Sequence, residues 1–395
     1  MAERLSTAWP LQQQWVPWAL IDQRLLWVVV AATLLGLVMM ASASVSLGQQ
    51  IMGDPLFYFK RQALFVLLAA AVAFTVLQVP LQLWERSGVW LLLLAIALLI
   101  LVLIPGVGRE VNGAVRWIPL GVINLQVAEP AKLLLSLYVA GYLVRRGEWL
   151  RTSMTAFLVP VAIAALCAFL LLRQPDFGTA LLLMGLVMTL LFLAGAPLWR
   201  FLVLAAGLVA VAVMLVLYSP YRWQRVTAFM DPWSDPFHTG FQLTQSLIAI
   251  GRGEWLGVGL GGSVQKLFYL PEAHTDFVFS VLAEEIGLVG VLAVIALFAF
   301  LTLYALRLGW QCHRYRLHFA GYIAWAAGLA IGMQAFINMG VATGLLPTKG
   351  LTLPFFSYGG SSALVTGAFV GLLLRAGCEL AYARAEGQRP EEERH

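Results

Sequence analysis

Ten apolar stretches, each long enough to cross a lipid bilayer as a helix, run through this chain of 395 residues. Because a helix rises about 1.5 Å per residue, about 20 apolar residues are needed to cross the hydrocarbon core. The stretches lie at residues 25–45, 57–79, 86–104, 129–146, 155–172, 178–196, 198–218, 277–306, 317–343 and 361–382. Charged residues make up only 11% of the chain, whereas soluble domains are about 25% charged. We therefore expect an all-α fold, a polytopic integral membrane protein with about ten transmembrane helices.

The positive charges indicate which ends of the spans face the cytoplasm. An even number of spans places both termini on one side. With both termini in the cytoplasm, 14 of the 25 Lys and Arg residues fall inside and 11 outside, which has the sign of the positive-inside rule. Four of the outer cations lie in one long loop, where charge is a weaker indicator of topology. These four are Arg222, Arg225, Arg252 and Lys266.

The spans also define the predicted domains and loops. The domains are a cytoplasmic N-terminal segment at 1–24, a single ten-helix membrane domain at 25–382 and a cytoplasmic tail at 383–395. A large extracytoplasmic loop, residues 219–276, joins the seventh and eighth spans. Its Gly and aromatic content argues against disorder, and Phe241–Ile250 predicts a short amphipathic helix. Outer loops from Pro105 and from Leu345 have the same mix of Gly, Pro, cations and aromatics, so three loops on one face suggest a site.

Several cofactors and partners are not indicated. Three cysteines are too scattered for a disulfide framework or a CxxC metal site, and the five histidines show no ligand spacing. The cysteines are Cys167, Cys312 and Cys378. Gly257, Gly259 and Gly262 match GxGxxG, but no strand precedes them, so a flexible turn is the better interpretation. The sequence has no GxxxxGK[ST] motif, so ATP is not indicated, and no nucleic-acid partner is expected.

One segment near the C-terminus, NMGVATGLLPTKGLTLPFFSYGGSS, resembles the signature of a known family. Its matching residues are Asn338, Gly344, Pro347, Gly350, Ser357, Tyr358, Gly359, Gly360 and Ser361. The family is the SEDS family of FtsW, RodA and SpoVE proteins. RQPDFGTA, LPEAHTDF and SDPFHTGFQLTQSLIAIGRGEWLGVGLGGSVQKL are also similar to its segments, so the resemblance covers most of the chain. PTKGLTLP and LPEAHTDF look more like the FtsW branch than the RodA branch.

The resemblance implies a division-type peptidoglycan glycosyltransferase. Such enzymes polymerise lipid II, a disaccharide-peptide on undecaprenyl diphosphate, outside the cytoplasmic membrane. It implies a multi-pass protein of the bacterial inner membrane at the division septum, with its active site on the extracytoplasmic face. It also implies a class B penicillin-binding protein transpeptidase and other division membrane proteins as partners.

Two other functions stay open from the residues, a transporter such as a lipid II flippase and a non-catalytic division scaffold. Intramembrane acids and Gly-rich loops suit a transporter. The span lengths show no two-fold repeat, however, and the polar groups cluster on the outer face instead of at the midplane. These features favour the enzyme.

The chemistry of glycosyl transfer from a diphosphate requires one base and nearby positive charge. A diphosphate leaves without a general acid, but it needs cations to stabilise it. Asp276 fits the base by its position at the outer end of the eighth span, and by resemblance it is the family's catalytic aspartate. From position alone, a helix N-cap formed with Thr275 is the alternative. His274 is a second candidate base, although an exposed loop histidine explains it better.

The candidate cations are distributed over the outer face. Glu129 and Lys132 are neighbours on one helix face, so they are either a buried ion pair or, by resemblance, part of a central cavity where Lys132 contacts diphosphate. Lys349 is the only cation of its loop, and the resemblance favours it over a solvated lysine. Further cationic candidates, which snorkelling explains almost as well, are Arg116, Arg173, Arg222 and Arg225. The resemblance adds Ser357, Gly359 and Gly360 as substrate-binding candidates.

Three features stay unassigned. Glu284 and Glu285 lie roughly 12 to 13 Å along the helix from Asp276, and successive positions cannot share a face. A functional role and a hydrogen-bonded structural role are equally good for them. No protein metal site is expected, because the outer side has no carboxylate cluster with ligand spacing. A Mg²⁺ or Mn²⁺ ion carried by the substrate's diphosphate stays open.

Overall fold

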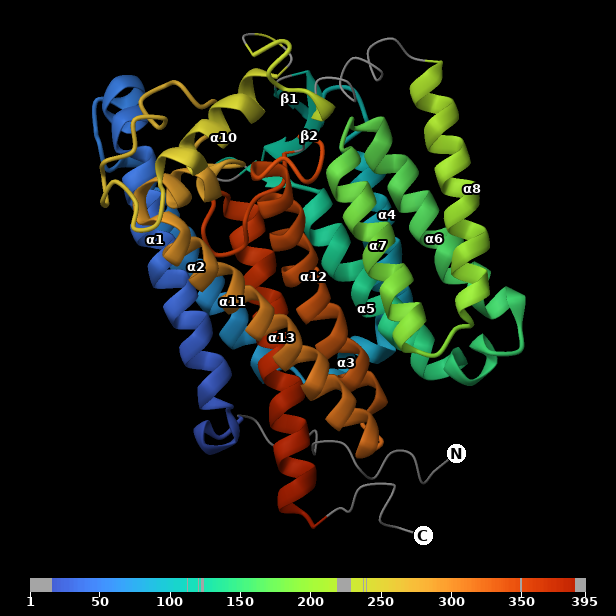
Figure 1. The fold of residues 1–395 in the computed structure, drawn as a ribbon. Helices are drawn as coiled ribbons and strands as arrows, with labels where there is room; N and C mark the ends of the chain where they lie inside the picture. The colour runs from blue at the N-terminus through green and yellow to red at the C-terminus, as the bar shows by residue number, and fades with distance from the viewer. Residues whose placement is uncertain are drawn as a thin grey trace.

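In the computed structural model, the chain is a bundle of long helices that carries a small β-sheet at one end (Figure 1). The structure describes residues 16–387 except 112, 120, 122–123, 219–228, 237, 239 and 349. Each predicted span coincides with one helix. These helices are α1 (Gln23–Met52), α2 (Phe57–Gln78), α4 (Gly88–Leu101), α5 (Ala128–Arg146), α6 (Met154–Arg173), α7 (Phe177–Leu193), α8 (Leu198–Leu217), α11 (Val278–Arg314), α12 (His318–Ala342) and α13 (Gly360–Ala385).

The length and composition of the helices are those of a polytopic membrane protein. Six of the described helices are long and apolar enough to cross a membrane, namely α1, α2, α6, α11, α12 and α13. The helices α4 and α7 and the start of α8 are shorter apolar segments. The helices α12 and α13 are mostly buried in the bundle, whereas α1, α2 and α11 leave much of their apolar surface exposed. Exposed apolar surface on this scale is what lipid covers in a membrane protein.

Local sequence determines several helix ends. Asp22 accepts hydrogen bonds from the N–H groups of Arg24 and Leu25 at the start of α1, at 2.9 and 3.2 Å. Asp176 caps α7 by accepting from the N–H of Thr179 at 3.1 Å. Side chains of this type satisfy N–H groups that the helix leaves unpaired.

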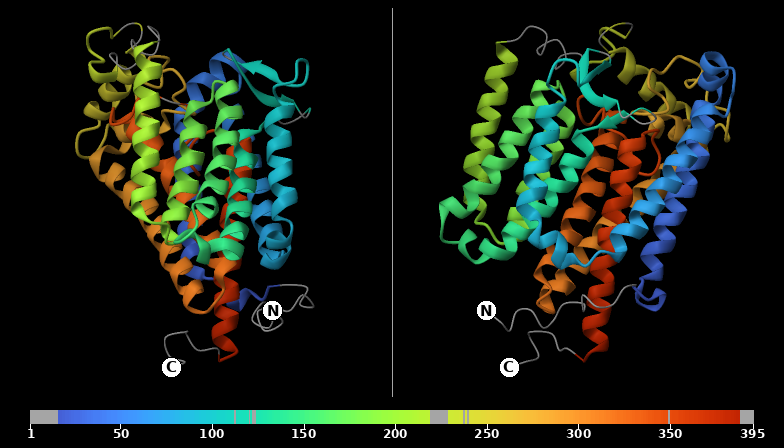
Figure 2. Two further views of the ribbon diagram at one scale, coloured as in Figure 1. Left: turned by 90° about the vertical axis from the view of Figure 1, so that its right-hand side faces the viewer. Right: turned by 180° about the vertical axis from the view of Figure 1, so that it is seen from behind.

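Both views of the fold place the start of α1 and the end of α13 at one end of the bundle (Figures 1 and 2). The strands and the helix α10 (Phe241–Arg252) lie at the opposite end. The predicted amphipathic helix at Phe241–Ile250 is therefore present and extends two residues further. Shorter helical turns are η2 (Trp18–Leu20), α3 (Leu81–Arg86) and η3 (Gly147–Leu150). The described parts of the three predicted outer loops lie together at the end that carries α10.

The sheet was not predicted, so the all-α expectation is wrong in this detail. Strands β1 (Arg109–Val111), β2 (Ala114–Pro119) and β3 (Asn124–Gln126) form an antiparallel sheet in the order β1-β2-β3. Gly113 has a φ of 75°, a conformation that tight hairpin turns require. Strands of three to six residues among Gly and Pro leave only a weak pattern in the sequence.

The helix α11 is interrupted, whereas the sequence predicted a continuous span. Gly287 has φ 65° and ψ −167°, which no α-helical residue adopts. The break separates a first half, residues 278–286, from a long second half that ends at Arg314. Glu284 and Glu285 lie directly before the break.

Candidate functional site

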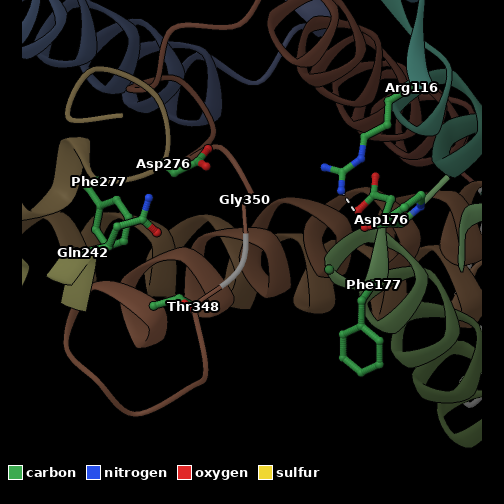
Figure 3. A pocket seen from close by; sticks show the side chains of 10 residues that line it. Arg116, Asp176, Phe177, Gln242, Asp276, Phe277, Thr348 and Gly350 are labelled. Carbon is green, nitrogen blue, oxygen red and sulfur yellow. Dashed lines mark hydrogen bonds between the residues drawn. The ribbon is translucent and has the colours of Figure 1, made fainter. Parts of the chain in front are cut away.

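A polar cavity of about 200 Å³ lies at the end of the bundle that carries β2 and α10 (Figure 3). Its lining residues are Arg116, Pro175, Asp176, Phe177, Gly178, Gln242, Asp276, Phe277, Thr348 and Gly350. They come from β2, the start of α7, α10, the segment before α11 and the loop between α12 and α13. In Figure 3, Asp276 and Gln242 lie on one side, and Arg116 and Asp176 lie on the other. Segments far apart in the sequence thus meet around two carboxylates, Asp176 and Asp276.

The backbone of Asp276 is held by two neighbouring segments. Its N–H donates to the carbonyl of Glu272 at 3.1 Å. Its carbonyl accepts from Nδ2 of Asn338, on α12, at 2.8 Å, and the same amide donates to the carbonyl of Leu351 at 2.6 Å. Asn338 therefore ties Asp276 to the loop that carries Gly350.

The carboxylate of Asp276 does not cap α11, so the capping interpretation is wrong. The helix begins at Val278, its N-cap is Phe277, and no side chain forms a cap hydrogen bond there. The hydroxyl of Thr275 donates instead to Oε2 of Glu272 at 2.7 Å. A Cβ atom added to Gly350 would lie 2.8 Å from Oδ2 of Asp276, so a glycine leaves the room that this carboxylate occupies.

Burial raises the pKa of Asp276 to about 7. The negative charge of Glu272 also raises this pKa, Arg116 lowers it, and Asp176 raises it. A carboxylate with a pKa near neutrality is a stronger base than an ordinary aspartate, and much of it is still ionised at pH 7. Such a pKa in a cavity is typical of functional sites.

His274 packs behind the segment that carries Asp276. Its ring lies 5.2 Å from that of Tyr58 and 5.8 Å from that of Tyr358, between centroids. Its carbonyl accepts from the N–H of Tyr358 at 2.9 Å. Burial lowers the pKa of the imidazole, and Glu272 opposes this shift. The side chain is half-buried instead of exposed, and it is not among the described residues that line the cavity.

Arg116 is the predicted cation that the described part of the chain brings to the cavity. Its Nε donates to the carbonyl of Gln174 at 3.0 Å, and a terminal nitrogen donates to the carbonyl of Pro175. The carboxylate of Asp176 is engaged by Thr179, with 3.1 Å to the N–H and 2.9 Å to the hydroxyl. Arg116 is thus oriented by backbone carbonyls of the turn between α6 and α7.

Lys132 and Glu129 are buried and form an ion pair, in agreement with the structural alternative. Nζ of Lys132 lies 2.9 Å from Oε2 of Glu129 and also donates to Oε1 of Gln334. The amide of Gln334 donates to the carbonyl and hydroxyl of Thr352, at 3.0 and 3.1 Å. Neither member of the pair is among the described lining residues. Lys132 is instead linked through Gln334 to the loop between α12 and α13.

The other predicted cations do not contribute described atoms to the cavity. Arg173 is exposed at the end of α6. Three lie outside the described residues, namely Arg222, Arg225 and Lys349. Thr348 and Gly350, the sequence neighbours of Lys349, both line the cavity.

The predicted substrate-binding residues of the last outer loop hold the loop itself. Oγ of Ser357 accepts from the N–H of Leu353 at 2.7 Å. The N–H of Gly359 donates to Oε1 of Gln62 at 3.2 Å. A Cβ atom added to Gly360 would lie 2.7 Å from the ring of Phe65. Ser357, Gly359 and Gly360 are not among the described lining residues.

Three polar lining residues were not predicted from the sequence, although they lie in segments that resemble the family. One is Thr348, in PTKGLTLP. Asp176 belongs to RQPDFGTA, and Gln242 belongs to SDPFHTGFQLTQ, both of which resemble the family. The resemblance of these segments to the family was the signal in the sequence that could have indicated these residues. What the sequence could not indicate is that α7, α10 and the segment before α11 meet at one place.

The described residues contain no group of three or more His, Cys, Asp or Glu side chains that could hold a metal ion. Glu284 and Glu285 are fully buried and ion-paired, Glu284 with Arg252 at 3.1 Å and Glu285 with Lys266 at 2.6 Å. Neither glutamate is among the described lining residues.

Comparison with known proteins gives consistent matches over nearly the whole chain. A family model of FtsW, RodA and SpoVE proteins, described as "cell cycle protein", matches residues 23–382. A probable peptidoglycan glycosyltransferase FtsW of Halorhodospira halophila is 74% identical over 375 residues, which is 95% of each chain. One of the same description from Alkalilimnicola ehrlichii is 57% identical, covering 94% of this chain and 92% of that protein.

Solved structures agree with these sequence matches. A chain from a peptidoglycan synthase complex, studied for its coordination of polymerization and crosslinking, has a TM-score of 0.72 at 32% identity. The match covers 91% of this chain and 98% of that one. The rod shape determining protein RodA of Thermus thermophilus has a TM-score of 0.67 at 30% identity, with coverage of 91% and 97%.

Proposed function

The chain belongs to the family of FtsW, RodA and SpoVE proteins and is a peptidoglycan glycosyltransferase, and we propose that Asp276 is the general base of its reaction. The observation that carries this proposal is the position of Asp276 on a polar cavity shared with Arg116, together with its pKa of about 7. Base and cation are the two parts that transfer from a diphosphate requires.

In the proposed reaction, Asp276 takes the proton of the acceptor's 4-hydroxyl. The hydroxyl oxygen attacks the donor's anomeric carbon and forms the new glycosidic bond. The bond between that carbon and the diphosphate oxygen breaks, and its electron pair leaves with undecaprenyl diphosphate. A single displacement of this kind inverts the configuration at the anomeric carbon. Arg116 stabilises the negative charge that develops on the leaving diphosphate.

The proposed substrate is lipid II, and the proposed partner is a class B penicillin-binding protein transpeptidase. The matched chain from a complex that coordinates polymerization and crosslinking supports such a pairing. The protein is a multi-pass protein of the bacterial inner membrane. We place it at the division septum with other division membrane proteins, and its cavity on the extracytoplasmic face. A Mg²⁺ or Mn²⁺ ion, where the reaction uses one, would enter with the diphosphate of the substrate. Asp176 and Asp276 are the carboxylates that line the cavity among the described residues.

The test is polymerisation of lipid II by the purified protein in detergent, alone and with its partner. Asp276→Asn is expected to lower the rate at least about 100-fold, the range of a lost general base. Glu110→Gln is the matched control, because it removes an exposed carboxylate on β1 that does not line the cavity, and it is expected to keep most of the activity. Glycan polymer formed by Asp276→Asn at the normal rate would remove Asp276 from the mechanism.

A further inference from the structure

The segment that follows α10, residues 254–269, packs into the break in α11. In an uninterrupted helix the N–H groups of Leu288 and Val289 would donate to the carbonyls of Glu284 and Glu285. Here they donate to the carbonyls of Glu254 and Trp255, at 2.9 and 3.2 Å. The carbonyls of Glu284 and Glu285 accept instead from the N–H groups of Val258 and Gly259, at 2.9 and 3.0 Å. The segment thus replaces both helical hydrogen bonds that the break removes.

Two glycines make this close approach of backbones feasible. Gly287 and Gly257 both have positive φ, 65° and 78°. A Cβ atom on Gly287 would lie 2.3 Å from the nitrogen of Gly257, and one on Gly257 would lie 2.2 Å from the carbonyl oxygen of Glu285. The GxGxxG match that begins at Gly257 is therefore a packing feature of this turn.

The side chains of the two buried glutamates hold the same segment. Glu284 accepts from Arg252 at 3.1 Å and from the hydroxyl of Ser263 at 2.5 Å. It also accepts from the N–H groups of Val264 and Gln265, at 3.1 and 3.3 Å. These four donors satisfy the hydrogen-bonding capacity of a carboxylate that has no access to water.

Glu285 is also paired, with a cation of the segment and with a hydroxyl group of α1. Its Oε1 lies 2.6 Å from Nζ of Lys266, and its carboxylate accepts from the hydroxyl of Ser42, on α1, at 2.6 Å. The role of the two carboxylates that the sequence left unassigned is thus to fix the segment onto α11 and α1.

Beyond Glu254, which is exposed at its start, the outward side of the segment is apolar. Trp255, Leu256 and Leu260 are 72%, 77% and 63% exposed, and residues 255–262 contain no charged side chain. Phe268 and Tyr269, a few residues later, are also more than half exposed. This surface continues directly into a row of exposed apolar side chains on the second half of α11. These are Leu288, Val289, Leu292 and Ile295.

The segment packs against α11 near Gly287, some way along the helix from its start. Gly287 follows Val278 by nine residues, which corresponds to roughly 13 Å along a helix. With the start of α11 at the membrane edge and a hydrocarbon core about 30 Å thick, any tilt of the helix brings this level closer to the edge, in the half of the bilayer on the side of the cavity. Irregular backbone is tolerated at such a level only where protein satisfies its polar groups, which α11 does here.

From these observations we propose that residues 254–269 form a re-entrant loop in the outer leaflet, where Trp255, Leu256 and Leu260 contact lipid acyl chains at the boundary with the headgroups. Amphipathic elements in this region bury apolar side chains about 5 to 10 Å deep. The proposal rests on the membrane fold, and the identity of the leaflet rests on the proposed extracytoplasmic orientation of the cavity. It is independent of the role of Asp276.

The experiment places a fluorescent label on Leu256→Cys in the full chain, reconstituted into phosphatidylcholine vesicles. The three native cysteines are buried, so they give little background labelling. Quenching is measured with a lipid nitroxide near the top of the acyl chain and with aqueous iodide. Leu292→Cys, on α11, is the control for lipid contact, and Glu110→Cys, on β1, is the control for water.

The expected result is that Leu256→Cys behaves like Leu292→Cys, with strong quenching by the lipid nitroxide and at least a several-fold smaller response to iodide than Glu110→Cys. Quenching like that of Glu110→Cys would place the loop in water and overturn the proposal. A label that neither quencher reaches would also overturn it, because protein, and not lipid, would then cover the surface.

Discussion

Asp276 combines two properties that oppose each other, a half-buried position and a need for charge. Burial raises its pKa from 3.8 to about 7, so ionising it in the folded protein costs free energy. The cost is tolerable because Asn338 and Glu272 hold the backbone of Asp276 whatever the charge of its carboxyl group. The raised pKa thus suits Asp276 to act as a base near neutral pH, and it lowers the stability of the folded protein.

This property predicts opposite effects of Asp276→Asn on activity and stability. The folded-state pKa is raised, so the carboxyl group's contribution to stability is complete below about pH 3.8 and is lost as the pH rises through about 7. Asparagine has no such loss. The variant is therefore expected to unfold at a higher temperature than the native protein at pH 8, with a smaller difference at pH 5, as measured by thermal unfolding in detergent.

The same pKa predicts the pH dependence of the native enzyme. The polymerisation rate should fall about tenfold per pH unit below pH 7 and level off above it, because only the ionised carboxylate accepts a proton. For the stability prediction, a difference in unfolding temperature between the native protein and Asp276→Asn that does not change with pH would contradict the assignment of this pKa to Asp276.

At the level of elements, α11 matters because its first half follows directly after Asp276. That half spans only residues 278–286, and a helix this short is marginal without tertiary support. Its support comes from the segment after α10 and from the pairs of Glu284 and Glu285. The break and its filling therefore set the position of Asp276 relative to the rest of the bundle.

Gly287→Ala tests this dependence. The new Cβ would meet the backbone of Gly257 at 2.3 Å, and alanine is strained at a φ of 65°. We expect a lower unfolding temperature and at least about a tenfold loss of polymerisation, because misplacing a reacting group by an ångström has effects of this size or larger.

Gly251→Ala is the matched control for this substitution. Gly251 lies in α10 with no atom within 4 Å of an added Cβ. Alanine there is expected to leave activity unchanged and to stabilise the helix by up to about 1 kcal/mol. Equal effects of the two substitutions would argue against a special role for the break.

At the level of the whole molecule, the bundle separates its two ends. The cavity, the sheet and α10 lie at one end, and the start of α1 and the end of α13 lie at the other (Figure 2). A substrate carried by lipid on the outer face can reach only one of these ends. The proposed function therefore requires that the end with the cavity be extracytoplasmic.

Labelling of single cysteines in intact cells tests this orientation. With a maleimide that cannot cross the membrane, Glu110→Cys is expected to react in intact cells, since residue 110 lies on β1. Glu386→Cys, just after α13, is expected to react only after the inner membrane is permeabilised. The reverse pattern would place the cavity in the cytoplasm and exclude the proposed function. The native protein, whose three cysteines are buried, measures the background.

The sequence alone determined that this protein lies in a lipid bilayer, where its helices are, and which residue is the candidate base. Apolar runs predict spanning helices because a helix satisfies its backbone hydrogen bonds locally, within a few residues. Each of the ten spans accordingly coincides with a helix, and the helix at α10 was predicted for the same reason. The motif LPEAHTDF also identifies Asp276 by its resemblance to the family, without any information on its surroundings in the fold.

Only the tertiary structure decided which groups surround that base. Arg116 reaches the cavity of Asp276, whereas Lys132 is paired with Glu129 and lies elsewhere. Glu284 pairs with Arg252 and Glu285 pairs with Lys266, next to a break in a helix that the sequence predicts as continuous. These contacts join segments that are far apart in the chain, and the polar pairings follow from how the helices pack. Hydrophobicity determines where a helix crosses the membrane, but it carries no information on which side chains face each other once the helices have assembled.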